Sequence, residues 1–239
     1  MSVERRRWHP GIMLRMANRA YAGIWSRDFS EATLIGQWRA LLETVPFSAE
    51  RAGFTELVIR AVDTAETPIF GQDFGSGEYG AEVVAELASE HAHEDCSYET
   101  GALWDLWTWD ESAGEWVQKP QPLEIGCYGR DFDEGIWKEQ GNFLIDAGFE
   151  HFFTGHARLL GFRPGEAEAA RDPEEANFVA AMSQPENLRE YQEKTQENIR
   201  KLYDWMARIE KAMPVERYQM WSEGEENFEA RMEEILAVR

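Results

Sequence analysis

The sequence has few of the features that mark a secreted or membrane-embedded protein. It contains only two cysteines, Cys96 and Cys127, which are too few for a disulfide framework. No run of about 18 apolar residues occurs that could span a membrane. Behind the three arginines of the opening segment MSVERRRWHPG there is no apolar run of the kind that a signal peptide has. We therefore expect a cytoplasmic protein with both thiols reduced and no membrane partner.

Positive charge is scarce and unevenly placed. The 239 residues carry 24 Lys and Arg against 45 Asp and Glu, which gives a formal net charge of -21. Residues 1–62 carry a net charge of +3, residues 63–162 a net -17 and residues 163–239 a net -7. Nucleic acids and anionic lipids need basic contacts, so we expect neither as a partner. The acidic field favours cations or a basic partner, and solubility alone is the simpler interpretation.

Apolar residues recur at strand and helix periods along residues 11–110. Period-two alternation predicts strands, and Pro68 places the third of them at the edge of a sheet. These expected strands span residues 11–25, 54–62, 67–74 and 102–110. Spacings of three and four predict one helix that Ser30 caps and Pro46 ends, and a second helix over residues 81–88. The resulting order β-α-β-β-α-β is that of a split βαβ unit of the ferredoxin-like kind.

Residues 111–162 repeat this pattern of short elements in part. The turn ESAG predicts a hairpin. Further strands are expected at 123–128, 143–149 and 152–160, with a short helix at 131–139. From Pro164 onward the composition is helical. A long helix is expected between Pro185 and Pro214, and Ser222 is expected to cap a last helix.

The predicted fold class is α+β. We expect an antiparallel or mixed sheet of ferredoxin-like (split βαβ) units, with a helical C-terminal segment packed on it. The sheet domain would span residues 1–162, in two ferredoxin-like halves of about 1–112 and 113–162, and the helical segment residues 163–239. No sequence identity links the two halves, so the duplication rests on topology alone.

Four of the ten tryptophans lie in the stretch LWDLWTWDESAGEW, residues 103–116. As a strand, this stretch places Asp105, Trp107 and Trp109 on one face. One interpretation is a ligand-binding groove, because an acid flanked by indoles suits a cationic or sugar ligand. The other is core, because aromatic strands are most often packing elements. We favour core, and expect the helix over residues 186–213 to cover Trp107 and Trp109.

The stretch HAHEDC carries three donors that suit zinc, at His91, His93 and Cys96. Residues two apart do not share a helix face, although they do share a strand face. The stretch also follows a predicted helix, where the helix dipole favours histidine. We expect it to be structural, with no metal and no cofactor bound.

Three other stretches match part of a known motif without its context. Residues 75–80, GSGEYG, fit a dinucleotide-binding loop, but Glu78 stands where a phosphate would lie, so we expect a flexible turn into a helix. His151 and His156 fall on opposite faces of the expected strand and have no nucleophile beside them. A group of acids without the calcium-loop pattern is expected to be a solvated turn: Asp131, Asp133 and Glu134.

These patterns favour a non-enzymatic binding protein over an enzyme. We expect the acidic middle region to meet a basic partner protein, as inhibitors and immunity-type proteins that neutralise nucleic-acid-binding toxins do. The alternative is an enzyme or small-molecule-binding domain with an aromatic and carboxylate-lined pocket around Asp105, Trp107 and Trp109. The placement of the acids on the surface separates the two. A continuous patch favours the partner, and a concave pocket with raised carboxyl pKa values favours the enzyme.

Overall fold

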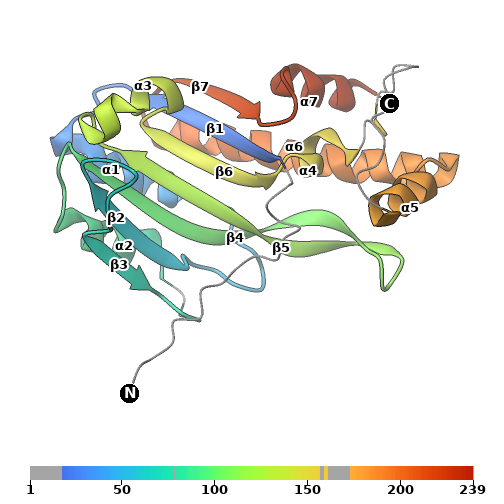
Figure 1. Cartoon of the computed structure of the whole chain (residues 1–239), viewed down its shortest axis with the longest axis horizontal. Coiled ribbons are helices and arrows are strands. Elements are labelled where there is room, and N and C mark those ends of the chain that lie inside the picture. The colour runs from blue at the N-terminus through green and yellow to red at the C-terminus, as the bar shows by residue number, and fades with distance from the viewer. Residues whose placement is uncertain (1–17, 78, 157–158, 161–172, 239) are drawn as a thin grey trace.

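A computed structural model of the chain describes residues 18–77, 79–156, 159–160 and 173–238. Within these ranges, seven strands form a single sheet in the order β3-β2-β4-β5-β6-β1-β7, and every neighbouring pair is antiparallel (Figure 1). The strands are β1 (Arg19–Ser26), β2 (Glu56–Ala61), β3 (Phe70–Asp73), β4 (Cys96–Asp110), β5 (Glu115–Tyr128), β6 (Phe143–Phe149) and β7 (Val215–Ser222). The expected α+β class is confirmed, with an antiparallel sheet.

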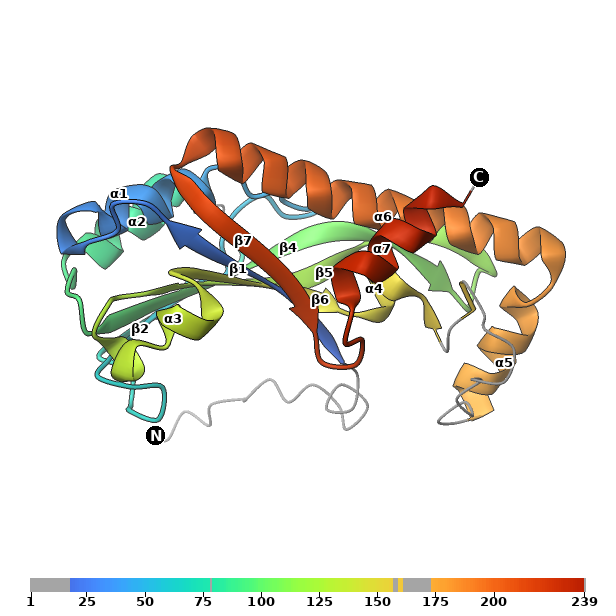
Figure 2. The ribbon, with the colours of Figure 1, turned by 90° about the horizontal axis from the view of Figure 1, so that it is seen from above.

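Three helices cover one face of this sheet: α1 (Glu31–Leu42), α2 (Ala81–Ser89) and the long α6 (Pro185–Ala212) (Figure 2). Large apolar side chains from the strands meet the helices there. Trp104 on β4, for example, has none of its surface exposed and lies 5.8 Å, between ring centroids, from Trp205 on α6. The remaining described helices are α3 (Trp137–Gln140), α4 (His151–Thr154), α5 (Pro173–Met182) and α7 (Phe228–Ala237), with a 3-10 turn at Phe132–Gly135.

Most elements expected from periodicity are present, with shifted ends. Helix α6 begins at Pro185 and ends at Ala212, just before Pro214, and β3 lies at the sheet edge as Pro68 indicates. Strand β4 begins at Cys96, earlier than expected, and β5 runs without a break from Glu115. The part of the first expected strand that precedes residue 18 lies outside the described residues.

Two expectations in the second half are wrong. Residues 152–160 were expected as a strand, but Phe152 and Phe153 belong to the helical turn α4, which packs both rings into the core. Ser222 does not cap the last helix, because it ends strand β7, and α7 begins after Asn227. Strand β7 itself was not expected. Its apolar residues Val215, Tyr218, Met220 and Trp221 do not alternate strictly, so the segment lacks the period-two pattern that predicts a strand.

The strand pairing also corrects the expected ferredoxin-like unit. Strand β1 pairs with β6 and β7, and not with any strand of residues 1–112. The reason lies in β4, whose two edges are taken by β2 and, through the ESAG hairpin, by β5. The β4–β5 pair crosses the expected boundary near residue 112, so both halves of the chain share one sheet. Duplication of the halves stays a prediction.

Candidate binding face

The sheet has a second face, opposite α1, α2 and α6, which we call the open face (Figures 1 and 2). Its side chains can be assigned from strand alternation, because successive residues of a strand point to opposite faces. Leu57, Ile125, Ile145 and Ala22 are at most 1% exposed and face the helices. Their sequence neighbours Glu56, Glu124, Asp146 and Tyr21 therefore belong to the open face.

The strand register places these neighbours in one line across the sheet. Each residue of the line is the direct cross-strand partner of the next, from β3 through β2, β4, β5, β6 and β1 to β7. The line consists of Asp73, Glu56, Gly101, Glu124, Asp146, Tyr21 and Trp221. We call the four carboxylates Asp73, Glu56, Glu124 and Asp146 the acidic row, and Tyr21 with Trp221 the aromatic pair.

The acidic row holds one internal cation. Arg19, on β1, forms an ion pair through its Nε atom with Asp146 Oδ2, and its guanidinium lies 5.5 Å from the ring centroid of Phe149. The backbone N–H of Gly148 donates a second hydrogen bond to Asp146 Oδ1, at 2.9 Å. Asp146 is thus the most enclosed member of the row, with 12% of its side chain exposed. Glu56, Asp73 and Glu124 are exposed.

Two members of the row have perturbed acidity. Partial burial, followed by the charge of Asp146 directly opposite, raises the pKa of Glu124 above its ordinary value. Burial also raises the pKa of Asp146, although its hydrogen bond and ion pair with Arg19 oppose the shift. Like charges placed directly opposite in an antiparallel pair are destabilising. The adjacent carboxylates Glu124 and Asp146 on the open face therefore do not add to the stability of the sheet.

The aromatic pair lies next to Asp146, at the β1–β7 end of the line. The rings of Tyr21 and Trp221 stack with centroids 5.7 Å apart and an interplanar angle of 25°. Gly23 lies beside this pair, and α3 approaches the open face there: a Cβ atom at Gly23 would meet the carbonyl oxygen of Gln140 and lie 3.0 Å from the indole of Trp221. Tyr21 donates its hydroxyl proton to Glu223 Oε1 at 2.9 Å. Burial and this hydrogen bond together raise the pKa of Tyr21, so the hydroxyl stays neutral at physiological pH.

One further ion pair lies beside the row on the same face. Glu99 on β4 stands directly opposite Val58 and Gly126. It lies two residues along β4 from Gly101 of the line, and therefore on the same face. Its Oε2 atom lies 2.5 Å from Nη1 of Arg60 on β2. This carboxylate is therefore neutralised within the chain, unlike its neighbours Glu56 and Glu124, for which the described residues provide no such ion pair.

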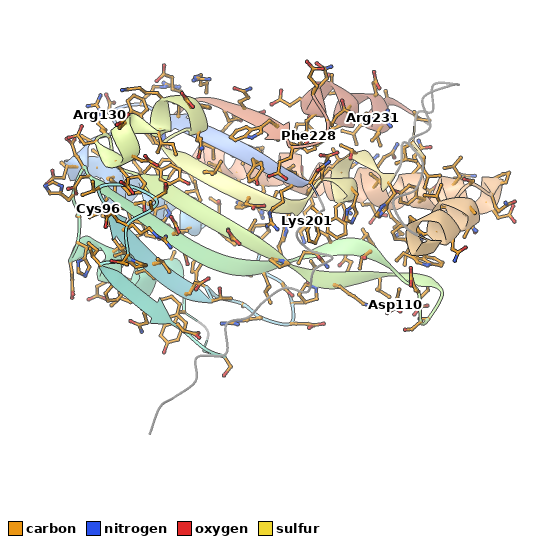
Figure 3. All side chains as sticks on the ribbon, viewed as in Figure 1. Cys96, Asp110, Arg130, Lys201, Phe228 and Arg231 are labelled. Carbon is orange, nitrogen blue, oxygen red and sulfur yellow. The ribbon has the colours of Figure 1, made fainter. Side chains whose placement is uncertain are left out.

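The predicted tryptophan site lies where β4 continues beyond β2 into the hairpin. There α6 runs along the free edge of β4, and Figure 3 shows Lys201 beside that strand and Asp110 near the hairpin tip. The side-chain amide of Asn198 pairs with that edge. Its Oδ1 accepts the N–H of Trp107 at 2.8 Å, and its Nδ2 donates to the carbonyl oxygen of Trp107 at 3.1 Å. Lys201 Nζ donates to the carbonyl oxygen of Asp105 at 2.7 Å.

The polar groups of this predicted site have partners inside the chain. Asp105 Oδ2 accepts the N–H of Ala49 at 2.9 Å. Trp107 donates its Nε1–H to Glu197, and the ammonium of Lys194 lies 3.6 Å from its ring centroid. The carboxylate of Asp105 and the indole of Trp107, which suggested a cationic ligand, thus already have partners within the chain. A ligand role for Asp105, Trp107 and Trp109 stays a prediction.

The expectation that the long helix covers these tryptophans is met in part, because Lys194 and Glu197 of α6 contact Trp107. Trp107 and Trp109 are half-buried, and Trp109 packs against Trp116 with ring centroids 5.6 Å apart. Trp116 in turn stacks on Tyr191 of α6 at 5.5 Å. The fully buried tryptophan of the stretch is Trp104, on the face that meets α4 and α6.

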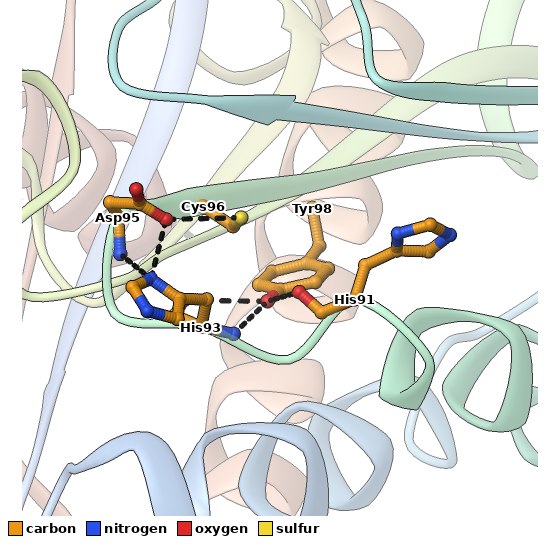
Figure 4. A network of polar contacts seen from close by, with 5 residues as sticks. All are labelled: His91, His93, Asp95, Cys96 and Tyr98. Atoms are coloured by element: carbon orange, nitrogen blue, oxygen red, sulfur yellow. Dashed lines mark hydrogen bonds and ion pairs between the residues drawn. The ribbon is translucent and has the colours of Figure 1, made fainter.

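The HAHEDC stretch lies in the turn between α2 and β4, and Figure 4 shows its rings pointing different ways. The ring of His93 meets Asp95, with Nδ1 to Oδ1 at 2.6 Å, whereas the ring of His91 packs on Phe70. Burial raises the pKa of Cys96 to about 11, so its thiol is protonated at neutral pH. Among the described residues, no three His, Cys, Asp or Glu side chains are grouped to hold a metal ion.

The other weak motifs also have local explanations. In the GSGEYG stretch, the carbonyl oxygen of Gly75 accepts a hydrogen bond from Arg51, and residue 78 lies outside the described residues. Asp133 accepts a hydrogen bond from the Thr64 hydroxyl at 2.9 Å within a 3-10 turn. His151 and His156 do come together, with stacked rings 4.1 Å apart, because helix α4 replaces the expected strand.

Comparison with known proteins gives no relative for this arrangement. No family model matches the chain, and no curated protein or solved structure is significantly similar to it. None of the helices in the described ranges is long and apolar enough to cross a membrane. The open face is therefore interpreted from its own geometry and charge.

Proposed function

We propose that this chain is a binding protein whose open face docks against a basic surface of a partner protein. The observation that carries the proposal is the acidic row, which aligns four carboxylates directly across strands β3, β2, β5 and β6. Neighbouring strands lie about 4.8 Å apart, so the row extends roughly 19 Å across the sheet. That length suits a segment or helix of a partner that presents several cations.

The energetics of the row favour a role in association. Glu124 and Asp146 repel each other across the β5–β6 pair. Arg19 forms an ion pair with Asp146 and offsets only part of the charge of Glu124. A cationic group of a partner would weaken this repulsion, so binding would remove part of the destabilisation that the free protein has. Complementary charge also accelerates association and disfavours acidic competitors. Inhibitors and immunity-type proteins that neutralise nucleic-acid-binding proteins use this form of recognition.

A second candidate function is an enzyme or small-molecule-binding domain. The observation that favours it is the raised pKa of the neighbouring carboxyl groups Glu124 and Asp146, since perturbed pairs of this kind occur at general acid–base sites. Both groups lie in the acidic row on the open face, and Asp146 is held by Arg19 and Gly148. Docking accounts for the whole row, whereas acid–base chemistry would use only Glu124 and Asp146 at one end of it.

The test is capture of a partner from the source organism with matched charge variants. The tagged protein should recover a basic protein at low salt and lose it at high salt, because exposed charge pairs are screened. The variant Glu56→Lys/Glu124→Lys should lose that protein. The control Glu86→Lys/Glu90→Lys changes the net charge equally on exposed positions of α2 and its end, and should retain it. Recovery of no salt-sensitive partner, or equal loss in both variants, would contradict the proposal.

A further inference from the structure

We propose that the aromatic pair and the adjacent carboxylates of the acidic row receive an arginine side chain of the partner. This inference rests on the proposed function and names its chemistry. The guanidinium would stack on the exposed surfaces of Tyr21 and Trp221, and Glu124, two strands away beyond Asp146, would supply the attracting negative charge. The argument depends on three features of the β1–β7 end of the open face.

The first feature is adjacency. Tyr21 is the direct cross-strand partner of both Asp146 and Trp221, and Asp146 is the partner of Glu124. Two aromatic rings therefore continue the line of carboxylates without a gap. Both rings are half-buried, so part of each is open to solvent. A ring beside a carboxylate is the combination that binds a guanidinium, because the ring attracts the cation and the carboxylate accepts its N–H groups.

The second feature is unequal compensation. Arg19 forms an ion pair with Asp146. Within the described residues, no such ion pair is found for Glu124. Partial burial, followed by repulsion from Asp146, raises the pKa of Glu124, and the charge of Arg19 opposes this shift only in part. Glu124 is exposed and lies next to Asp146 across the strands. Among the exposed carboxylates of the row, Glu124 is the one whose strand lies nearest to the aromatic pair, so we assign it the cation of the partner.

The third feature is an internal counterpart on the same two strands. Arg217 on β7 is the cross-strand partner of Trp25 on β1, and its guanidinium lies 3.5 Å from the centroid of that indole. Trp25 and Tyr21 are four residues apart in β1, so both belong to the open face. The chain therefore already stacks one arginine on an aromatic ring of this face. The aromatic pair offers a second position of the same kind, with a carboxylate beside it.

These features favour arginine over lysine. A guanidinium is planar, stacks on aromatic rings and presents N–H groups in a fork that matches a carboxylate. An ammonium is a compact and strongly hydrated charge that gains less from a ring surface. Charge alone would bind both residues equally, so a preference for arginine is the property that separates this site from a general acidic surface.

The experiment compares oligo-arginine and oligo-lysine peptides of equal length, titrated at low salt into the full chain by calorimetry. We expect the arginine peptide to bind about two- to fivefold more tightly, the ratio that one cation–π contact supplies. Trp221→Leu should reduce that ratio to about one and leave the affinity for oligo-lysine nearly unchanged. Glu124→Gln should weaken both peptides. Trp109→Leu, which removes a half-buried indole from the hairpin, should preserve the ratio.

The outcomes separate this inference from the proposed function. Equal affinity of the wild-type protein for the two peptides overturns the arginine site, whether or not the Trp221→Leu variant folds. If Glu124→Gln still weakens both peptides in that case, the acidic row stands as a docking surface without arginine selectivity. If Trp109→Leu abolishes the preference instead, the site lies at the hairpin tryptophans and the inference is wrong. If neither peptide responds to Glu124→Gln, the proposed function fails as well.

Discussion

Glu124 lies directly opposite Asp146 in the β5–β6 pair, two carboxylates on the open face of an antiparallel sheet. Such a pair is destabilising relative to a neutral one. Glu124→Gln should therefore stabilise the protein, raising the free energy of unfolding at pH 7 by about 0.2–1 kcal/mol. Chemical denaturation of the variant measures the change. Glu86→Gln, an exposed substitution on α2, is the control and should have no clear effect. A loss of stability in Glu124→Gln would show that the carboxylate serves packing.

The same pair predicts a pH dependence of opposite sign to ordinary acid denaturation. The pKa of Glu124 is raised in the folded protein above its ordinary value of 4.5, so the folded state binds the proton more tightly than the unfolded state. Its contribution to stability is therefore present below the ordinary pKa and is lost as pH rises through the raised value. Comparing wild type with Glu124→Gln across pH 4 to about pH 7 should show the gain from the variant increasing with pH. A gain that decreases with pH would contradict the assignment.

His151 predicts a contribution in the other direction. Burial, followed by the neighbouring His156, holds the pKa of His151 well below its ordinary value. The folded state thus binds this proton less tightly, and stability is lost as pH falls through the ordinary histidine pKa of about 6.5. His151→Phe keeps a ring in the stack with Phe149 and should reduce that loss, as measured by thermal melts at neutral and mildly acidic pH. His93→Gln, at an exposed histidine, should leave the loss in place.

The tryptophan stretch gives a prediction about stability alone. Trp104 is fully buried between Phe153 and Trp205, so Trp104→Ala should cost about 3–5 kcal/mol through lost burial and the cavity that remains. Trp109 is half-buried at the hairpin, and Trp109→Ala should cost clearly less. Denaturant melts of the two variants test the order. Equal losses would show that the hairpin tryptophans contribute as much to the core as Trp104 does.

The sequence predicted the elements better than their pairing. Helix α6 is long and strongly periodic, and prolines mark both of its ends, so its position could be found from local pattern. The pairing of β1 with β6 and β7 depends on contacts between residues more than a hundred positions apart, which periodicity does not encode. Strand β7 escaped prediction for a local reason, since its apolar residues Val215, Tyr218, Met220 and Trp221 do not alternate strictly along the strand.

The acidic row shows why the candidate site could not be assembled from sequence. Each strand contributes a single acid to a mostly apolar stretch, as in ELVIRA, LEIGCY and FLIDAGF. Acids inside such strands could have been noted as unusual, but only the register shows that Glu56, Glu124 and Asp146 fall in one line. The tryptophan stretch drew attention because its residues are adjacent in sequence, and α6 supplies partners for the polar groups there.

Carboxylate footprinting tests the central claim, that the open face is the surface that binds basic partners, most directly. Carbodiimide-driven labelling of acidic side chains would be measured by mass spectrometry with and without an oligo-arginine peptide at low salt. Glu56, Asp73 and Glu124 should be protected by the peptide, whereas Glu86 and Glu90 at the α2 helix and Glu111 at the hairpin should label as before. Protection centred on the hairpin, or spread evenly over all exposed acids, would contradict the assignment of the open face.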